Sequence, residues 1–439
     1  DLSTSSYNTF VGSMSGYEVT TNEGNVFLGY QAGKNTAGNY HYNVAIGMQA
    51  LLSAHTQSGT VAIGYKSLED LLGGDGNTAL GYQSGKNITT GNYNTTLGHN
   101  AGATLVDDSS NTLIGYKSGE SSVASNTVAI GFETLKGSVE TGANGTVAIG
   151  YQALTALTSG AKNLAIGESA MAAMTTGERN IAIGVAALQH SDTGTNNIAI
   201  GYGVMYDQNV GGSGNAADSD HNIGIGSLAL SGAWTDATSQ WNVSIGSSSM
   251  AGAMAGANSN VAIGNQSLGS LTSGDENTAV GANSLLNLTQ GGQNVSLGAY
   301  SSEDLTTGTS NVCLGVEAGH ELTTASSNVA IGKSTLDRMD GAVTQNVAIG
   351  AAAMHGNLSN VAITGCVAIG HEALEGTLTT GANYSVAIGK EALKNLTSGS
   401  HNVAVGYQSG YSHTTGGNNV SVGNTSMALI GAGSANTAI

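Results

Sequence analysis

One five-residue pattern of polar, β-branched, small, aliphatic and glycine residues recurs along the chain. Its copies include residues 43–47, 180–184, 277–281 and 402–406, and most successive closing glycines are 17 residues apart. Alternation of β-branched with small residues is typical of a short β-strand, and glycine ends the run. A period of 17 is too short for repeats of two helices. The pattern therefore predicts an all-β chain in which about 25 coils of a parallel β-solenoid, or β-roll, stack on one another.

The second half of each coil is less regular than this first strand. Residues 66–72 and 391–396 are compatible with one helical turn per coil, whereas residues 83–91 fit a strand or a turn more easily. Both alternatives remain open from the sequence.

Asparagine occupies the position four residues before the closing glycine in 19 of 24 complete motifs. Stacked at an inter-strand spacing of about 4.8 Å, such side chains donate and accept hydrogen bonds along the stack. We therefore predict a structural asparagine ladder. Its members include Asn43, Asn77, Asn94, Asn163, Asn180, Asn260, Asn294, Asn328 and Asn402.

The closing glycines form a second column. A sharp turn at the end of each strand, with a positive φ or a neighbouring coil pressed close, is tolerated only without a Cβ. We refer to them as turn glycines. They include Gly47, Gly64, Gly81, Gly98, Gly167, Gly184, Gly264, Gly281, Gly332 and Gly406.

The alternation within the strand also predicts which side chains face inward. We expect the Val and Ile positions to point into the coil and the small residue between them to point outward. Because a solvent-facing column would carry charge, uniformly small residues favour close packing against another subunit. The alternative is a flat, exposed sheet of small residues.

Departures from the period divide the array. Residues 1–201 are predicted to be regular repeats, residues 202–225 an inserted loop, and residues 226–439 repeats that continue to a last coil cut before its glycine. We therefore expect the array either to extend further or to meet a different domain. Loops inserted in repeat proteins often carry binding residues. Trp234 and Trp241 lie near this loop, and we expect them either to stack on a sugar or to cap a wider coil.

Composition excludes several classes of partner. The chain has a net charge of −18, which disfavours nucleic acid and anionic membranes, and it has no apolar run long enough to cross a membrane. It contains 67 glycines and no proline, unlike collagen.

The two cysteines of the chain, Cys313 and Cys366, are predicted to lie about three coils apart, roughly 15 Å, which is too far for a disulfide.

No chemical motif emerges from the repeats. The ten histidines, among them His99, His221 and His320, show no recurring phase, so we expect no metal site and no cofactor. No nucleophile elbow, phosphate loop or carboxylate pair has the spacing that catalysis needs, so we expect no enzyme. Recurring threonine pairs, such as Thr89 and Thr90, leave ice binding as a rival, although adjacent threonines in a strand face opposite sides.

The repeated Asn-Val-Ala-Ile-Gly run resembles the YadA-like head repeats of trimeric autotransporter adhesins, and residues 77–85 resemble repeat regions of bacteriophage tail fibres. The resemblance implies an elongated homotrimer that attaches a virion or cell to a surface. We therefore expect a structural fibre shaft or adhesin rod that is extracellular, on a cell-surface appendage or virion, with a host-surface glycan or protein as receptor. The alternative is a self-assembling extracellular filament that binds no receptor.

Overall fold

The computed structural model is an all-β parallel β-solenoid with a repeat of about 17 residues, which confirms the predicted fold class. The structure describes residues 5–35, 38, 40–53, 56–121, 124–137, 143–207, 219–234, 238–339, 341–356 and 361–439. The chain divides into two compact units, Asp1–Asn209 and Val210–Ile439. No helix among the described residues is long and apolar enough to span a bilayer.

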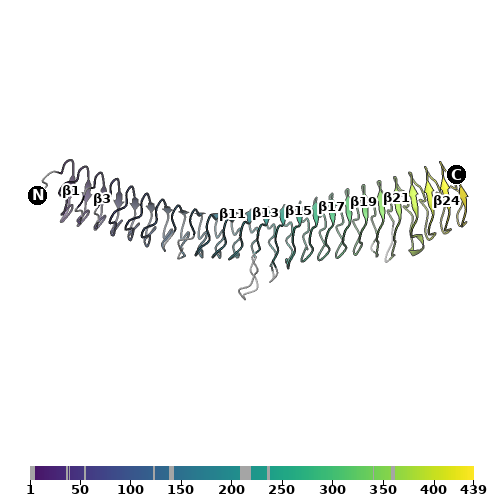
Figure 1. Cartoon of the computed structure of the whole chain (residues 1–439), viewed down its shortest axis with the longest axis horizontal. Helices are drawn as coiled ribbons and strands as arrows, with labels where there is room; N and C mark the ends of the chain where they lie inside the picture. The colour runs from purple at the N-terminus through teal and green to yellow at the C-terminus, as the bar shows by residue number, and fades with distance from the viewer. Residues whose placement is uncertain are drawn as a thin grey trace. The chain divides into compact units, whose positions relative to one another are not determined.

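The described residues of the first unit form twelve strands, and successive strands within the unit pair in parallel (Figure 1). The strands are β1 (Thr9–Val11), β2 (Val26–Leu28), β3 (Val44–Ile46), β4 (Val61–Ile63), β5 (Thr78–Leu80), β6 (Thr95–Leu97), β7 (Thr112–Ile114), β8 (Val128–Ile130), β9 (Val147–Ile149), β10 (Leu164–Ile166), β11 (Ile181–Ile183) and β12 (Ile198–Ile200). Equivalent residues pair directly, as Ala165 does with Ala182, so each strand residue lies beside its counterpart one coil away.

In the second unit, the part of the chain that the structure describes forms thirteen strands paired in the same way (Figure 1). They are β13 (Ile223–Ile225), β14 (Val243–Ile245), β15 (Val261–Ile263), β16 (Thr278–Val280), β17 (Val295–Leu297), β18 (Val312–Leu314), β19 (Val329–Ile331), β20 (Val347–Ile349), β21 (Val367–Ile369), β22 (Val386–Ile388), β23 (Val403–Val405), β24 (Val420–Val422) and β25 (Thr437–Ala438). A single turn of 3-10 helix, η1 (Thr380–Ala382), precedes β22.

The predicted direction of the strand side chains is wrong. In β11 the central Ala182 is fully buried, whereas Ile181 and Ile183 on either side are only half-buried, and the same pattern recurs in most other strands. The small-residue column therefore faces the interior of its own coil and makes no contact with another subunit. The β-branched and aliphatic residues face outward instead.

The interior is filled from the second half of each coil, which explains this reversal. Leu285 and Leu288 are fully buried opposite Ala279, and Leu68 and Leu71 take the same places in the first unit. In a coil of only 17 residues, two leucines from one wall leave space for little more than a methyl group on the other. The strand therefore presents alanine inward.

The second half of the coil is neither strand nor helical turn but a run of turns with left-handed residues. In the coil after Gly150, Gln152 and Leu154 have φ values of 52° and 53°, and Lys66 and Leu68 have 53° and 51°. Alternating left-handed residues let backbone N–H groups point along the stack, as when Leu154 N–H donates to Ala170 carbonyl at 3.0 Å. This hydrogen bonding between coils replaces the bonds within a helix.

The first residues of the predicted inserted loop, 202–207, continue the regular coil. Val204 and Met205 are fully buried in the places that Ala187 and Leu188 occupy one coil earlier, and Leu188 N–H donates to Val204 carbonyl. Apolar residues at interior positions thus continue the coil as far as the structure follows it, to residue 207. The centre of the predicted loop, residues 208–218, lies outside the described residues.

Candidate functional site

The asparagine column forms buried ladders in each unit, interrupted where another residue takes the asparagine position. Asn277 Oδ1 accepts from the backbone N–H and the side-chain amide of Asn294, both at 3.0 Å, and Asn294 Oδ1 accepts in the same way from Asn311. Asn294 Nδ2 also donates to the carbonyl of Gly308 at 2.9 Å. The nine asparagines named from the sequence are all buried. Each therefore satisfies backbone groups of neighbouring coils as well as its own amide, and the column is structural.

The ladder has a gap at Thr60, which stands between Asn43 and Asn77. Thr60 N–H donates to Asn43 Oδ1 at 2.9 Å, but the buried Thr60 hydroxyl has no hydrogen-bond partner among the described residues. We expect Thr60→Asn to raise the free energy of unfolding by about 1 kcal/mol, because the longer amide fills the ladder position and finds partners. Urea titration followed by circular dichroism measures the gain, and a less stable variant would contradict a ladder built for asparagine.

The two tryptophans have different environments. Trp234 is 1% exposed and lies in the interior, so the hypothesis that both stack on a sugar is wrong for this residue. Trp241 is 57% exposed, and its ring stacks on His221 with centroids 4.0 Å apart. Since His221 covers one face of the Trp241 ring, that face is closed to a contact from outside.

A ladder of stacked rings that was not predicted from the sequence follows the turn glycines of the first unit. Successive centroids lie 4.7 to 5.4 Å apart. The rings belong to Tyr65, Tyr82, His99, Tyr116, Phe132 and Tyr151. Because each inner ring covers its neighbours' faces, edges and hydroxyls face the solvent, and the ladder offers no row of open ring faces to a sugar. The signal in the sequence was the shared position directly after the turn glycine.

The recurring threonines also form a column along the stack. Thr272 hydroxyl donates to Thr289 carbonyl at 2.8 Å, Thr289 to Thr306 at 3.1 Å and Thr306 to Thr323 at 2.9 Å. These hydroxyls are therefore engaged in bonds between coils, which favours the turn-forming role over an array that orders water.

A column of charged and polar side chains lies five residues after successive turn glycines in the second unit. It consists of Glu303, His320, Asp337, His355, Glu375 and Lys394. The His320 ring lies 3.0 Å from Glu303 and 3.6 Å from Asp337, and the His355 ring lies 3.8 Å from Asp337. Two histidines thus share one phase of the repeat, contrary to the sequence prediction. Counting positions from each turn glycine would have revealed them.

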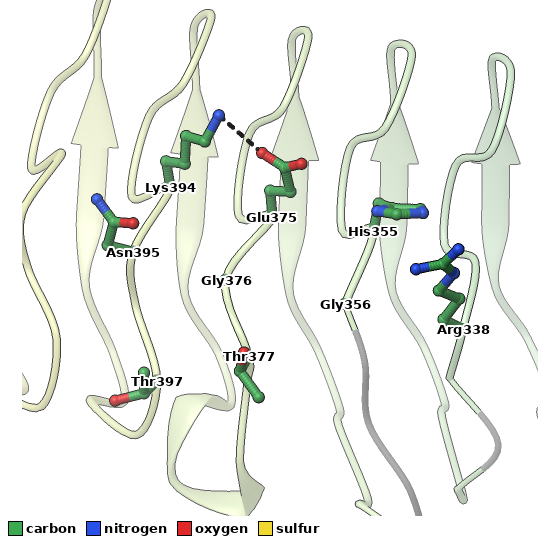
Figure 2. A pocket seen from close by; sticks show the side chains of 9 residues that line it. All are labelled: Arg338, His355, Gly356, Glu375, Gly376, Thr377, Lys394, Asn395 and Thr397. Atoms are coloured by element: carbon green, nitrogen blue, oxygen red, sulfur yellow. Dashed lines mark ion pairs between the residues drawn. The ribbon is translucent and has the colours of Figure 1, made fainter.

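A shallow pocket of about 460 Å³ adjoins the end of this polar column, and Figure 2 shows the side chains that line it. His355 lies between Arg338 on one side and Glu375 with Lys394 on the other. Lys394 Nζ is 2.9 Å from Glu375 and also pairs with Glu372. The hydrogen bond from Lys394 holds the pKa of the Glu372 carboxyl below its ordinary value, and the pKa of Lys394 is raised in turn. The pair therefore stays ionised at neutral pH and links the coils that carry it.

The two cysteines are free and buried. Burial raises the pKa of the Cys313 thiol to about 11 and also raises the pKa of Cys366. At neutral pH both are therefore protonated thiols with little nucleophilic character.

The outward-facing residues of the strands give each unit an apolar surface. We define the outer stripe as the first and third residues of the strands, which form two parallel columns of Val, Thr, Ile and Leu. In the second unit Ile245, Ile263, Leu297, Ile388 and Val420 are each 36 to 39% exposed. Such a contiguous apolar surface is a mark of an interaction site.

No protein-family model matches the chain, and no curated protein matches it either.

Proposed function

We propose that the chain is a structural fibre shaft or adhesin rod of a phage or virus tail fibre or of a bacterial surface appendage, and that it acts outside the cell as a homotrimer. The observation that carries this proposal is the outer stripe. In a single chain it leaves two columns of aliphatic side chains in water along every coil, and apolar burial of roughly 25 cal/mol per Å² favours covering them.

Several features of the coil support a role as a rigid spacer. Equivalent strands pair in register from coil to coil, and the asparagine ladder adds a second set of bonds along the stack. In such an array each coil is stabilised mainly by its neighbours, so rigidity and resistance to proteolysis extend with length.

Self-association is the best use of the outer stripe. A second and third copy of this chain would present identical columns at the same spacing, so apolar rows could match over many coils. The net charge of −18 disfavours nucleic acid as the partner of this chain. The resemblance of the repeats to YadA-like heads favours three copies. A host-surface glycan or protein is the receptor that this role requires.

A self-assembling filament without a receptor is the second candidate function, because strands at the ends of a solenoid array can pair with another copy. It predicts masses that grow with concentration, whereas a fibre shaft predicts one discrete oligomer.

The proposed assembly is tested by placing charge in the outer stripe. We expect the double variant Ile263→Lys with Leu297→Lys to sediment as a single chain, because a lysine buried in an apolar interface costs several kcal/mol. Each lysine is tolerated in a chain that is not associated with other copies, because its ammonium group reaches water there.

The matched control is the double variant Ser273→Lys with Ser310→Lys, which adds the same charge at exposed positions outside the strands. It should sediment like the unaltered chain. Equal sedimentation of the two double variants would show that the outer stripe is not the contact between subunits.

A further inference from the structure

We propose that His320 and Asp337 of the polar column, together with the neighbouring Glu321, hold a divalent transition-metal ion, of which Zn²⁺ is the typical case. Among the residues that the structure describes, these three each offer a ligand atom, and the three atoms lie within 4.8 Å of one another. One imidazole with two carboxylates is a donor set that suits Zn²⁺ and its first-row neighbours.

The spacing of the donors is close to what the ion requires. His320 Nδ1 and Asp337 Oδ1 are 3.6 Å apart. Zinc bonds of about 2.1 Å in a tetrahedron place neighbouring ligand atoms roughly 3.4 Å apart, so this pair needs only a small closure. The two residues come from adjacent coils, five positions after Gly315 and Gly332, and the stacking of the solenoid fixes their separation.

The ring of His320 is held in the orientation that a metal ligand needs. Its Nε2 lies 3.0 Å from Glu303 Oε2, one coil away on the opposite side from Asp337. A carboxylate that accepts the proton of one ring nitrogen leaves the other as a free lone pair and raises its basicity. Glu303 therefore directs Nδ1 toward Asp337 and acts as a positioning residue.

Asp337 is the most buried member of the group, with a side chain 8% exposed. Its Oδ1 accepts from the backbone N–H of Arg338 at 2.8 Å, and its Oδ2 lies 3.8 Å from His355 Nε2. This carboxylate is thus held between two imidazoles and a backbone donor. A cation bound beside this carboxylate would neutralise its buried charge.

The test is calorimetric titration of the full chain with ZnCl₂ at neutral pH, followed by the visible spectrum of the Co²⁺-loaded protein. We expect saturable binding of one ion per chain and a tetrahedral Co²⁺ spectrum. His320→Gln should weaken binding by at least about 10-fold, and Glu303→Gln should weaken it by about 10-fold through loss of orientation.

His401→Gln is the matched control, because His401 is an exposed histidine of the same unit whose ring lies beside Ser400. It should bind Zn²⁺ as the unaltered chain does. Circular dichroism and sedimentation of each variant establish that it is folded. Failure of the unaltered chain to bind Zn²⁺, or equal affinity in His320→Gln, would overturn the proposal; equal affinity in Glu303→Gln would overturn the positioning role.

Discussion

Gly281→Ala is expected to lower the free energy of unfolding of the second unit by about 3 kcal/mol or more. Gly281 has a φ of 135°, where side chains other than hydrogen are strained, and a Cβ there would lie 2.5 Å from Gly298 carbonyl oxygen. The contacted atoms belong to the backbone of the next coil, so relief requires that the two coils separate. Urea unfolding and hydrogen exchange of the amides in β16 and β17 measure the effect.

The matched control for this substitution is Gly431→Ala. Gly431 has no atom within 4 Å of its Cβ direction and does not have a strained positive φ. We expect Gly431→Ala to change the free energy of unfolding by less than about 0.5 kcal/mol. If Gly281→Ala were as mild as this control, the turn glycines would not be required by the close approach of the coils.

Asn294→Leu is expected to lower the free energy of unfolding by about 2 to 4 kcal/mol, because it leaves buried polar groups without partners. The backbone N–H of Asn311 loses its acceptor, Asn294 Oδ1, and the carbonyl of Gly308 loses its donor, Asn294 Nδ2. Hydrogen exchange measured by mass spectrometry should show the amide of Asn311 exchanging faster while amides several coils away keep their protection.

Asn287→Leu makes the same chemical change in the same coil at a half-buried position, where the Asn287 amide donates to Asp304. We expect it to change the free energy of unfolding by less than about 0.5 kcal/mol. Equal destabilisation by the two substitutions would contradict a special role for the buried ladder.

The period of the repeat and the position of its turn could be predicted from the sequence, because the backbone conformation there requires particular residue types. Gly281 recurs in phase with its neighbours, and only glycine tolerates both the φ of 135° and the close approach of Gly298. The position of Asn294 follows from the same phase. These features are local, and each coil repeats them.

Which strand side chains face the interior could not be predicted in the same way. Alternation shows that Ala182 and Ile183 face opposite sides, but it does not show which side is the interior. The volume of the coil decides this, because leucines such as Leu188 already occupy the inner space. Counting all apolar columns, including the two leucine positions after the turn glycine, would have shown more apolar volume than one narrow coil encloses.

The polar column was missed for a different reason. His320 and His355 are 35 residues apart, which is not a multiple of 17, because one coil between them is a residue longer. Measured from their own turn glycines they share a position, and the structure places Asp337 between them. The same register pairs Glu69 with Lys86 in the first unit. Side chains on a repeat lattice must therefore be aligned on the turn, not on the residue number.

The mass of the unaltered chain in native solution tests the central claim most directly. A fibre shaft whose outer stripe is covered by two further copies predicts one species at three times the chain mass of 43.5 kDa, unchanged over a wide range of concentration. A single species at 43.5 kDa, with the outer stripe left in water, would contradict it.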